Sequence, residues 1–236
     1  MLQNISRGAL FARSGTIHPL NNVLRLYSPC HHRSIATYLH SGSRVRGLKK
    51  NSDEYLTVQH NDKKLHIDRV DLSAYKNEIF DKLNIHKYGI DLDENLVLQC
   101  LTHKSFAHGL KPYNEKLSVM GYHFMKYFAI VKDMTKLQNS ESANKTNIIG
   151  SAFSKRVLSN DVLNKVFEQH QLQDLVFWKK RALDHNEGNF NGEFTVHSTC
   201  LKALIGAILL KNGQEKTLQF FEQEIYHKMI QLASKQ

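Results

Sequence analysis

The sequence predicts an all-α protein with a basic, largely unstructured N-terminal extension. From residue 71 onward, apolar side chains recur every three or four positions, which is the spacing of one helix face. The 236-residue chain has only three prolines, so long helices are permitted almost everywhere, and strand patterns are weak. Its hydrophobic content of 41% excludes a wholly disordered chain.

The N-terminal segment differs in composition from the rest of the chain. The first 50 residues contain eight basic residues and no Asp or Glu. An Arg-rich, Ser-containing, acid-free segment is typical of a mitochondrial transit peptide, and apolar residues at near-helical spacing surround Arg7 and Arg13. We therefore expect a transit peptide over residues 1–27 and a location in the mitochondrial matrix. The alternative is a disordered basic arm that binds RNA phosphates.

Residues 28–70 are predicted to form a basic extension of the mature protein. The RNA-binding candidates in this extension are Arg33, Arg44, Arg46, Lys49 and Lys50. Residues 51–236, by contrast, hold 24 basic and 22 acidic residues. The net charge of +10 is thus mainly a property of the N-terminus, and it does not indicate a basic nucleic-acid-binding domain.

The remaining chain reads as a series of helices. We expect them over residues 71–85, from a cap at Asp91 or Asp93 to Leu101, and over residues 114–134, 147–158, 161–170, 195–210 and 214–233. Asn114 is a candidate N-cap and Gly213 a candidate C-cap. Residues 179–193 are polar and turn-rich, which predicts a loop.

Cysteine usage and hydropathy exclude several other classes of protein. The three cysteines form no CxxC pair, which argues against a disulfide scaffold or a Cys-ligated zinc site and suits a reducing compartment. The longest apolar stretch, residues 203–210, is shorter than the roughly 18 residues of a membrane span, so we expect none.

Two segments carry the most specific pattern. Residues 101–105 read LTHKS, and NEKLSVMGY follows at 114–122; residues 198–207 read STCLKALIGA. In this order and spacing they resemble the ribonuclease III domain, whose motifs are L-T-H-R/K-S, N-E-R/K-L-E-F-L-G-D and A-D-x-x-E-A-L-I-G. The resemblance covers roughly residues 71–233 and implies an RNase III-like domain over residues 71–236.

The resemblance implies two-metal phosphodiester hydrolysis, in which four carboxylates on two helices hold divalent ions. Here the four corresponding positions carry Ser118, Tyr122, Thr199 and Lys202. None is a carboxylate, and an ammonium group repels a dication. We therefore expect a pseudoenzyme with no catalytic residue, no metal site and no cofactor. Gly121 and Gly206 are predicted to be close-packing positions.

Two further sets of residues are candidates for contacts. Lys179, Lys180 and Arg181 follow Trp178, so these cations could bind RNA while the aromatic ring stacks on a base; an ordinary basic loop is the alternative. The family pairs two domains through the helix that carries N-E-R/K-L. By that resemblance the dimer-interface candidates are Leu117, Met120 and Phe124, which could equally belong to the core.

The family's active members carry a double-stranded-RNA-binding domain, and we expect none here because the last predicted helix ends the sequence. With a transit peptide and a degenerate site, the chain resembles the smaller RNase III-like proteins of fungal mitochondrial large ribosomal subunits. That resemblance implies a structural ribosomal protein that binds large-subunit rRNA and forms a heterodimer with a second RNase III-like protein. The alternatives are a mitochondrial RNA-processing endoribonuclease subunit and a ribosome assembly factor.

Overall fold

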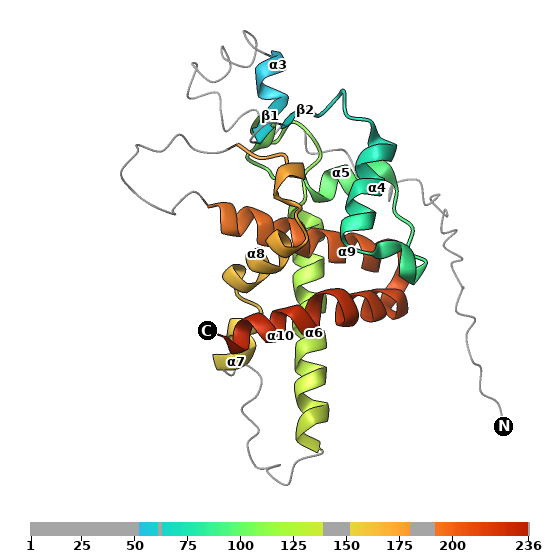
Figure 1. Cartoon of the computed structure of the whole chain (residues 1–236), viewed down its shortest axis with the longest axis vertical. Helices are drawn as coiled ribbons and strands as arrows, with labels where there is room; N and C mark the ends of the chain where they lie inside the picture. Colours follow the sequence, from blue (N-terminus) through green and yellow to red (C-terminus); the bar gives the residue numbers. More distant parts are fainter. Residues whose placement is uncertain (1–51, 61–62, 139–151, 180–191, 236) are drawn as a thin grey trace, which may run out of the picture. The chain divides into compact units, whose positions relative to one another are not determined.

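A computed structural model describes residues 52–60, 63–138, 152–179 and 192–235 of the chain, and this part is mainly helical (Figure 1). The predicted all-α class is confirmed. The proposed transit peptide and the basic candidates between Arg33 and Lys50 lie outside the described residues.

The first long helix is α4 (Leu72–Lys82). Asp71 caps it, because its carboxylate accepts hydrogen bonds from the backbone N–H groups of Ser73 and Ala74. The helix ends before the predicted residue 85, since Asn84 adopts a left-handed conformation with φ of 54°. A short 3-10 turn, η2 (Ile85–Tyr88), follows.

The next helix, α5 (Glu94–Cys100), begins directly after Asp93, so this residue rather than Asp91 occupies the N-cap position. Its side chain makes no capping hydrogen bond. The LTHKS segment follows α5 and leads into η3 (Phe106–Gly109), where Ala107 and His108 both have positive φ.

Two long helices, α6 (Glu115–Gln138) and α9 (Glu193–Phe220), pack against each other in the centre of the helical part (Figure 1). Asn114, the candidate N-cap of α6, is buried, and its amide nitrogen donates to the Cys100 carbonyl oxygen at 3.0 Å. Helical dihedral angles in α9 break at Gly213, whose φ is 79°. A glycine with positive φ commonly ends a helix, so the break agrees with the predicted C-cap at this residue.

The chain continues after this break through η5 (Phe221–Tyr226), a π-helical segment, into α10 (His227–Ser234). Between α6 and α9 lie α7 (Ala152–Val157), α8 (Asn160–Gln169) and η4 (Gln173–Leu175). Helix α8 is capped by Ser159, whose hydroxyl accepts from the Val162 N–H, and it packs against α9 and α10.

A β-hairpin was not predicted from the sequence. Helix α3 (Ser52–Tyr55) leads into the antiparallel strands β1 (Thr57–His60) and β2 (Lys63–His66). Val58 and Ile67 join the hydrophobic core, and His60 Nε2 lies 2.7 Å from the Val176 carbonyl oxygen. The described part therefore begins within the segment that the sequence assigns to the extension.

The helical run Glu193–Ser234 is long and apolar enough to cross a membrane by length and composition alone. Of its apolar window, 61% is buried inside the protein. Burial of this kind is what a core helix of the folded domain requires.

Candidate functional site at the crossing of α6 and α9

The backbones of α6 and α9 touch where the two motif helices cross. A Cβ atom added to Gly121 would lie 1.8 Å from the Lys202 carbonyl oxygen, and one added to Gly206 would lie 2.1 Å from the Leu117 carbonyl oxygen. Only glycine permits such an approach, so the structure confirms the predicted close-packing role of both residues. The four positions that correspond to the ligands of the ribonuclease III motifs lie on these two helices, and two of them, Tyr122 and Lys202, are in contact.

The hydroxyl groups at two of these positions bond to their own helices. Ser118 Oγ donates to the Glu115 carbonyl oxygen at 2.8 Å, and Thr199 Oγ1 donates to the Thr195 carbonyl oxygen at 2.6 Å. Ser118 is also buried. Both hydroxyls are therefore held against the helix that carries them.

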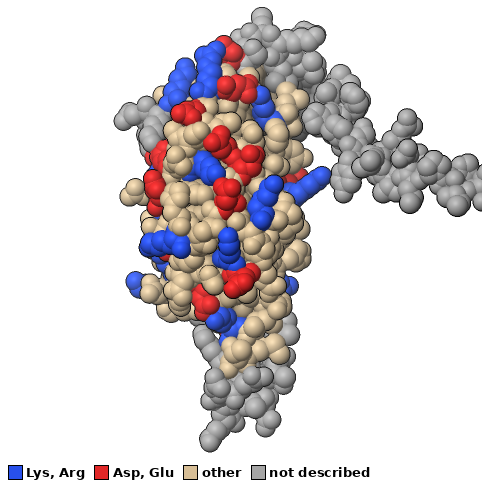
Figure 2. Space-filling model, turned by 90° about the vertical axis from the view of Figure 1, so that its right-hand side faces the viewer, with Lys and Arg blue, Asp and Glu red and all other residues tan. Residues whose placement is uncertain are grey.

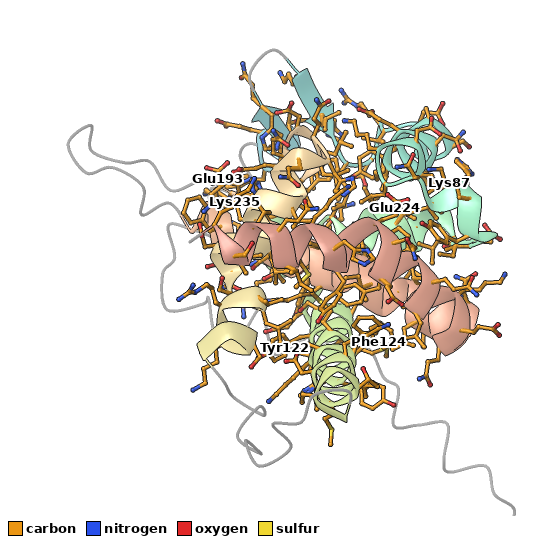
Figure 3. The ribbon with its side chains drawn as sticks, turned by 60° about the horizontal axis from the view of Figure 1, so that its bottom comes forward. Lys87, Tyr122, Phe124, Glu193, Glu224 and Lys235 are labelled. Atoms are coloured by element: carbon orange, nitrogen blue, oxygen red, sulfur yellow. The ribbon has the colours of Figure 1, made fainter. Side chains whose placement is uncertain are left out.

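Lys202 reaches from α9 across to both neighbouring helices. Its ammonium Nζ donates to Asn160 Oδ1 at 2.9 Å and lies 5.3 Å from the ring centroid of Tyr122. The same Asn160 oxygen accepts from Ser198 Oγ at 3.0 Å. Burial of its stem lowers the pKa of Lys202. In Figure 3, Tyr122 and Phe124 lie on different sides of α6, so the tyrosine points to the crossing and the phenylalanine to the core.

Sequence reasoning missed Asn160. It is the first residue of α8, 42 positions before Lys202, and no motif connects the two. Only the packing of α8 against α9 brings them together.

The residues at the crossing do not fit a pair of divalent cations. A metal site needs anionic or neutral oxygen and nitrogen ligands, whereas Lys202 places a cation there. Within the described ranges, no three His, Cys, Asp or Glu side chains are close enough together to hold a metal ion. Glu115, the motif acid that is retained, is exposed and pairs with Lys104 Nζ at 3.0 Å.

The basic candidates after Trp178 are only partly described. Lys179 is exposed, and its Nζ lies 5.2 Å from the ring centroid of Tyr55, while Lys180 and Arg181 lie outside the described residues. Trp178 is only 4% exposed. The hypothesis that this ring stacks on a base is therefore wrong for the described conformation, because the ring belongs to the core.

Two of the three dimer-interface candidates lie in the core. Leu117 and Phe124 are each 7% exposed, and Met120 is half-buried. Other apolar residues of α6 are exposed by 38–54%; we call this group the α6 face, and its members are Val119, Tyr127, Val131 and Met134. Their spacing places them along one side of the helix.

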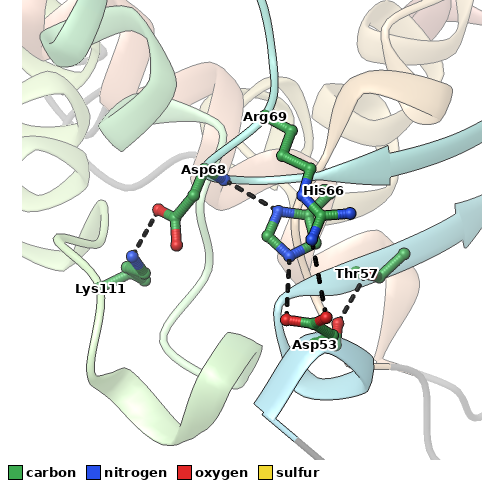
Figure 4. Close-up of polar contacts among 6 residues, drawn as sticks. All are labelled: Asp53, Thr57, His66, Asp68, Arg69 and Lys111. Carbon is green, nitrogen blue, oxygen red and sulfur yellow. Dashed lines mark hydrogen bonds and ion pairs between the residues drawn. The ribbon is translucent and has the colours of Figure 1, made fainter.

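A cleft of about 1080 Å³ lies between the hairpin, α3 and α4. On its wall the Asp53 carboxylate lies 3.6 Å from Arg69 and 4.0 Å from His66 Nε2. Outside the cleft, Lys111 pairs with Asp68 at 2.5 Å (Figure 4). These opposite charges bond to one another. They join α3 and the η3 loop to the hairpin, which is a structural role.

The surface that faces the viewer in Figure 2 carries acidic and basic side chains interspersed. The pattern agrees with the nearly balanced charge of residues 51–236. On this face, therefore, the folded domain does not carry the continuous basic patch that is typical of a dedicated nucleic-acid-binding domain.

Comparisons with known proteins agree with the motif analysis. A family model described as "Ribonuclease-III-like" matches residues 93–229. Ribonuclease 3 of Corynebacterium efficiens is 26% identical over 179 residues, which cover 73% of this chain and 68% of that protein. Ribonuclease 3 of Bacteroides thetaiotaomicron is 29% identical over 140 residues, which cover 57% of this chain and 40% of that protein. A solved nuclease domain of ribonuclease III from Campylobacter jejuni aligns with a TM-score of 0.47 and 21% identity over 68% of this chain and 96% of that chain.

Proposed function

The chain belongs to the ribonuclease-III-like family, and from this premise we propose that it is a non-catalytic member that serves as a structural component of the mitochondrial large ribosomal subunit. The observation that carries the proposal is the set of residues at the crossing of α6 and α9. Four positions that would hold metal ions carry three neutral side chains and the Lys202 ammonium. Without bound metal ions, no water is activated and no leaving oxygen is stabilised.

The competing function is that of an endoribonuclease, since the curated relatives are named ribonuclease 3. The test is incubation of the purified chain with double-stranded RNA in Mg²⁺ and in Mn²⁺, with a bacterial ribonuclease 3 as positive control. We expect no cleavage. Cleavage that EDTA abolishes, and that persists through repurification, would support the nuclease and overturn the proposal.

The proposal includes a second RNase III-like protein as the partner that docks on this chain. The α6 face supports it, because four exposed apolar side chains on one side of a helix favour burial against another protein. We expect a Tyr127→Lys/Val131→Lys double variant to lose the co-purifying partner while its unfolding temperature stays unchanged. Leu110→Lys, which changes an exposed apolar residue outside α6, is the matched control.

Contacts with rRNA would come mainly from the basic extension, from Arg33 to Lys50, and from Lys179 to Arg181. The folded domain has nearly balanced charge, which suits a peripheral subunit that is held by one protein partner and a basic tail.

Sedimentation of a mitochondrial lysate in high salt and magnesium tests the ribosomal role. Co-migration with the large subunit at about one copy per particle supports a permanent subunit. Release of the chain to the top fractions by salt would favour a transient assembly factor. Absence from mitochondria would overturn the location together with the ribosomal role.

A further inference from the structure

Most half-buried lysines of the described domain pair with a carboxylate, whereas the ammonium group of Lys202 donates to a neutral oxygen. Lys228 is a second exception, since it donates to the His170 ring. Lys76 bonds to Asp91 at 2.9 Å and Lys82 to Glu78 at 2.8 Å. Lys202 donates only to the neutral amide oxygen of Asn160 and lies over the ring of Tyr122. An ammonium group has three N–H donors, so donors remain for an anion at this place.

The surroundings of this ammonium favour a negative ligand. Asn160 is exposed and is the first residue of α8, where the helix dipole adds positive potential. Its amide oxygen is occupied by Ser198 and Lys202, while its amide nitrogen donates to none of the described residues. The nearest acid in the sequence, Asp161, is already paired with Lys165 at 2.9 Å.

We infer that Lys202 and Asn160 form a binding site for a phosphate group of the RNA backbone, one that needs no metal ion. The inference rests on the proposed function, in which rRNA supplies the ligand. Tyr122 and Asn160, which both contact Lys202, are exposed, so a phosphate that is part of a polynucleotide can approach from the surface. A charged donor and a neutral amide donor together are a common way to bind such a group.

The test measures the affinity of the full chain for a 20-base-pair RNA duplex in EDTA, over a series of salt concentrations. Lys202→Met removes the charge and keeps most of the stem. Lys126→Met, which changes an exposed lysine of α6, is the matched control that leaves the basic extension equally intact. We expect Lys202→Met to weaken binding about tenfold and to lower the salt slope by about one, the effect of one lost phosphate contact. Lys126→Met and Lys202→Arg should stay close to the wild type.

Three results would overturn the inference: equal affinities of Lys202→Met and Lys126→Met, binding that requires magnesium, or saturable binding of inorganic phosphate at residue 202 without any effect on RNA affinity. The third result would indicate a site for a free anion. If Lys202→Met unfolds, Asn160→Ala tests the same site and should weaken RNA binding with a normal unfolding temperature. Co-sedimentation of each variant with the large subunit is scored separately, so the phosphate site can fail while the ribosomal role stands.

Discussion

At the scale of single residues, two glycines determine the geometry of the site. Gly121 and Gly206 let the backbones of α6 and α9 touch, and this contact places Lys202 against Tyr122. The arrangement therefore depends on the absence of two Cβ atoms.

Gly206→Ala should lower the free energy of unfolding by about 1–3 kcal/mol, because the new Cβ would lie 2.1 Å from the Leu117 carbonyl oxygen and the helices must separate. In a helix without that contact, the same change would stabilise by up to ~1 kcal/mol. Urea denaturation measures the difference. Gly192→Ala is the control, since a Cβ there has open space and only the positive φ of 70° opposes it. A Gly206 variant as stable as the wild type would contradict the close contact.

The motifs in the sequence predicted the close-packing role of both glycines, because the family spaces them regularly along two helices. That the four substituted positions correspond to metal ligands stays a prediction. The motifs did not identify Asn160, whose role depends on how a third helix packs. The basic run after Trp178 suggested that its ring stacks on a base, but the ring is buried, because residues distant in sequence determine whether a ring lies in the core.

At the scale of elements, helix starts differ in how they are stabilised. Asp71 accepts hydrogen bonds from two backbone N–H groups of α4, whereas Asp93 occupies the same position before α5 without such a bond. The sequence predicted a helix at both places, because residue type alone indicates a cap. It could not show which carboxylate is actually bonded.

Asp71→Ala should therefore cost about 1 kcal/mol of stability, the usual value of a capping side chain. Asp93→Ala should lower the stability by only a few tenths of a kcal/mol, because no capping hydrogen bond is lost. Thermal unfolding of the two variants, side by side with the wild type, gives the comparison. Equal losses would mean that the caps act through the helix dipole rather than through their hydrogen bonds.

Among the elements, the β-hairpin could not be predicted from the sequence. Its strands have four residues each, TVQH and KKLH, and their apolar content is too low for a clear alternating pattern. What stabilises them is docking of Val58, His60 and Ile67 on the helical part. These contacts join residues that are distant in the sequence, so the pattern of neighbouring residues cannot predict them.

At the scale of the whole domain, His170 connects three helices. It lies at the end of α8, and its Nδ1 donates to the carbonyl oxygen of Lys82, the last residue of α4, at 2.8 Å. Its Nε2 accepts from Lys228 of α10 at 2.9 Å. The second bond requires a neutral ring, because a protonated Nε2 cannot accept, whereas the first also forms with a protonated ring. Burial and then the Lys228 charge lower the pKa of His170 from its ordinary 6.5.

Stability should consequently depend on pH in the acidic range. Above about pH 6.5, His170 is neutral in both the folded and the unfolded chain, and its contribution is constant. As the pH falls below that value, the unfolded chain takes up the proton first, so stability decreases until the lowered folded pKa is passed. The slope from one such group is at most ~1.4 kcal/mol per pH unit. His103, whose pKa is also lowered by burial, acts in the same direction.

The measurement is denaturant unfolding between pH 8 and pH 5, with His170→Gln and, as a control, the exposed His227→Gln. We expect the His170 variant to be less stable at neutral pH and to lose part of the pH dependence, whereas the His227 variant should follow the wild type. An unchanged slope in the His170 variant would assign the pH dependence to other groups.

The hydrogen bond between His60 and the Val176 carbonyl spans 116 residues, and this separation has a consequence for the timing of folding. A chain is synthesised from its N-terminus, so β1 and β2 emerge long before the segment on which they dock. An isolated two-stranded hairpin is at best marginally stable in water. The hairpin can therefore dock only after the segment around Val176 has been synthesised, and contacts over long sequence separations form slowly. We expect it to acquire protection from amide hydrogen exchange last during refolding, after the helices around α9 have assembled.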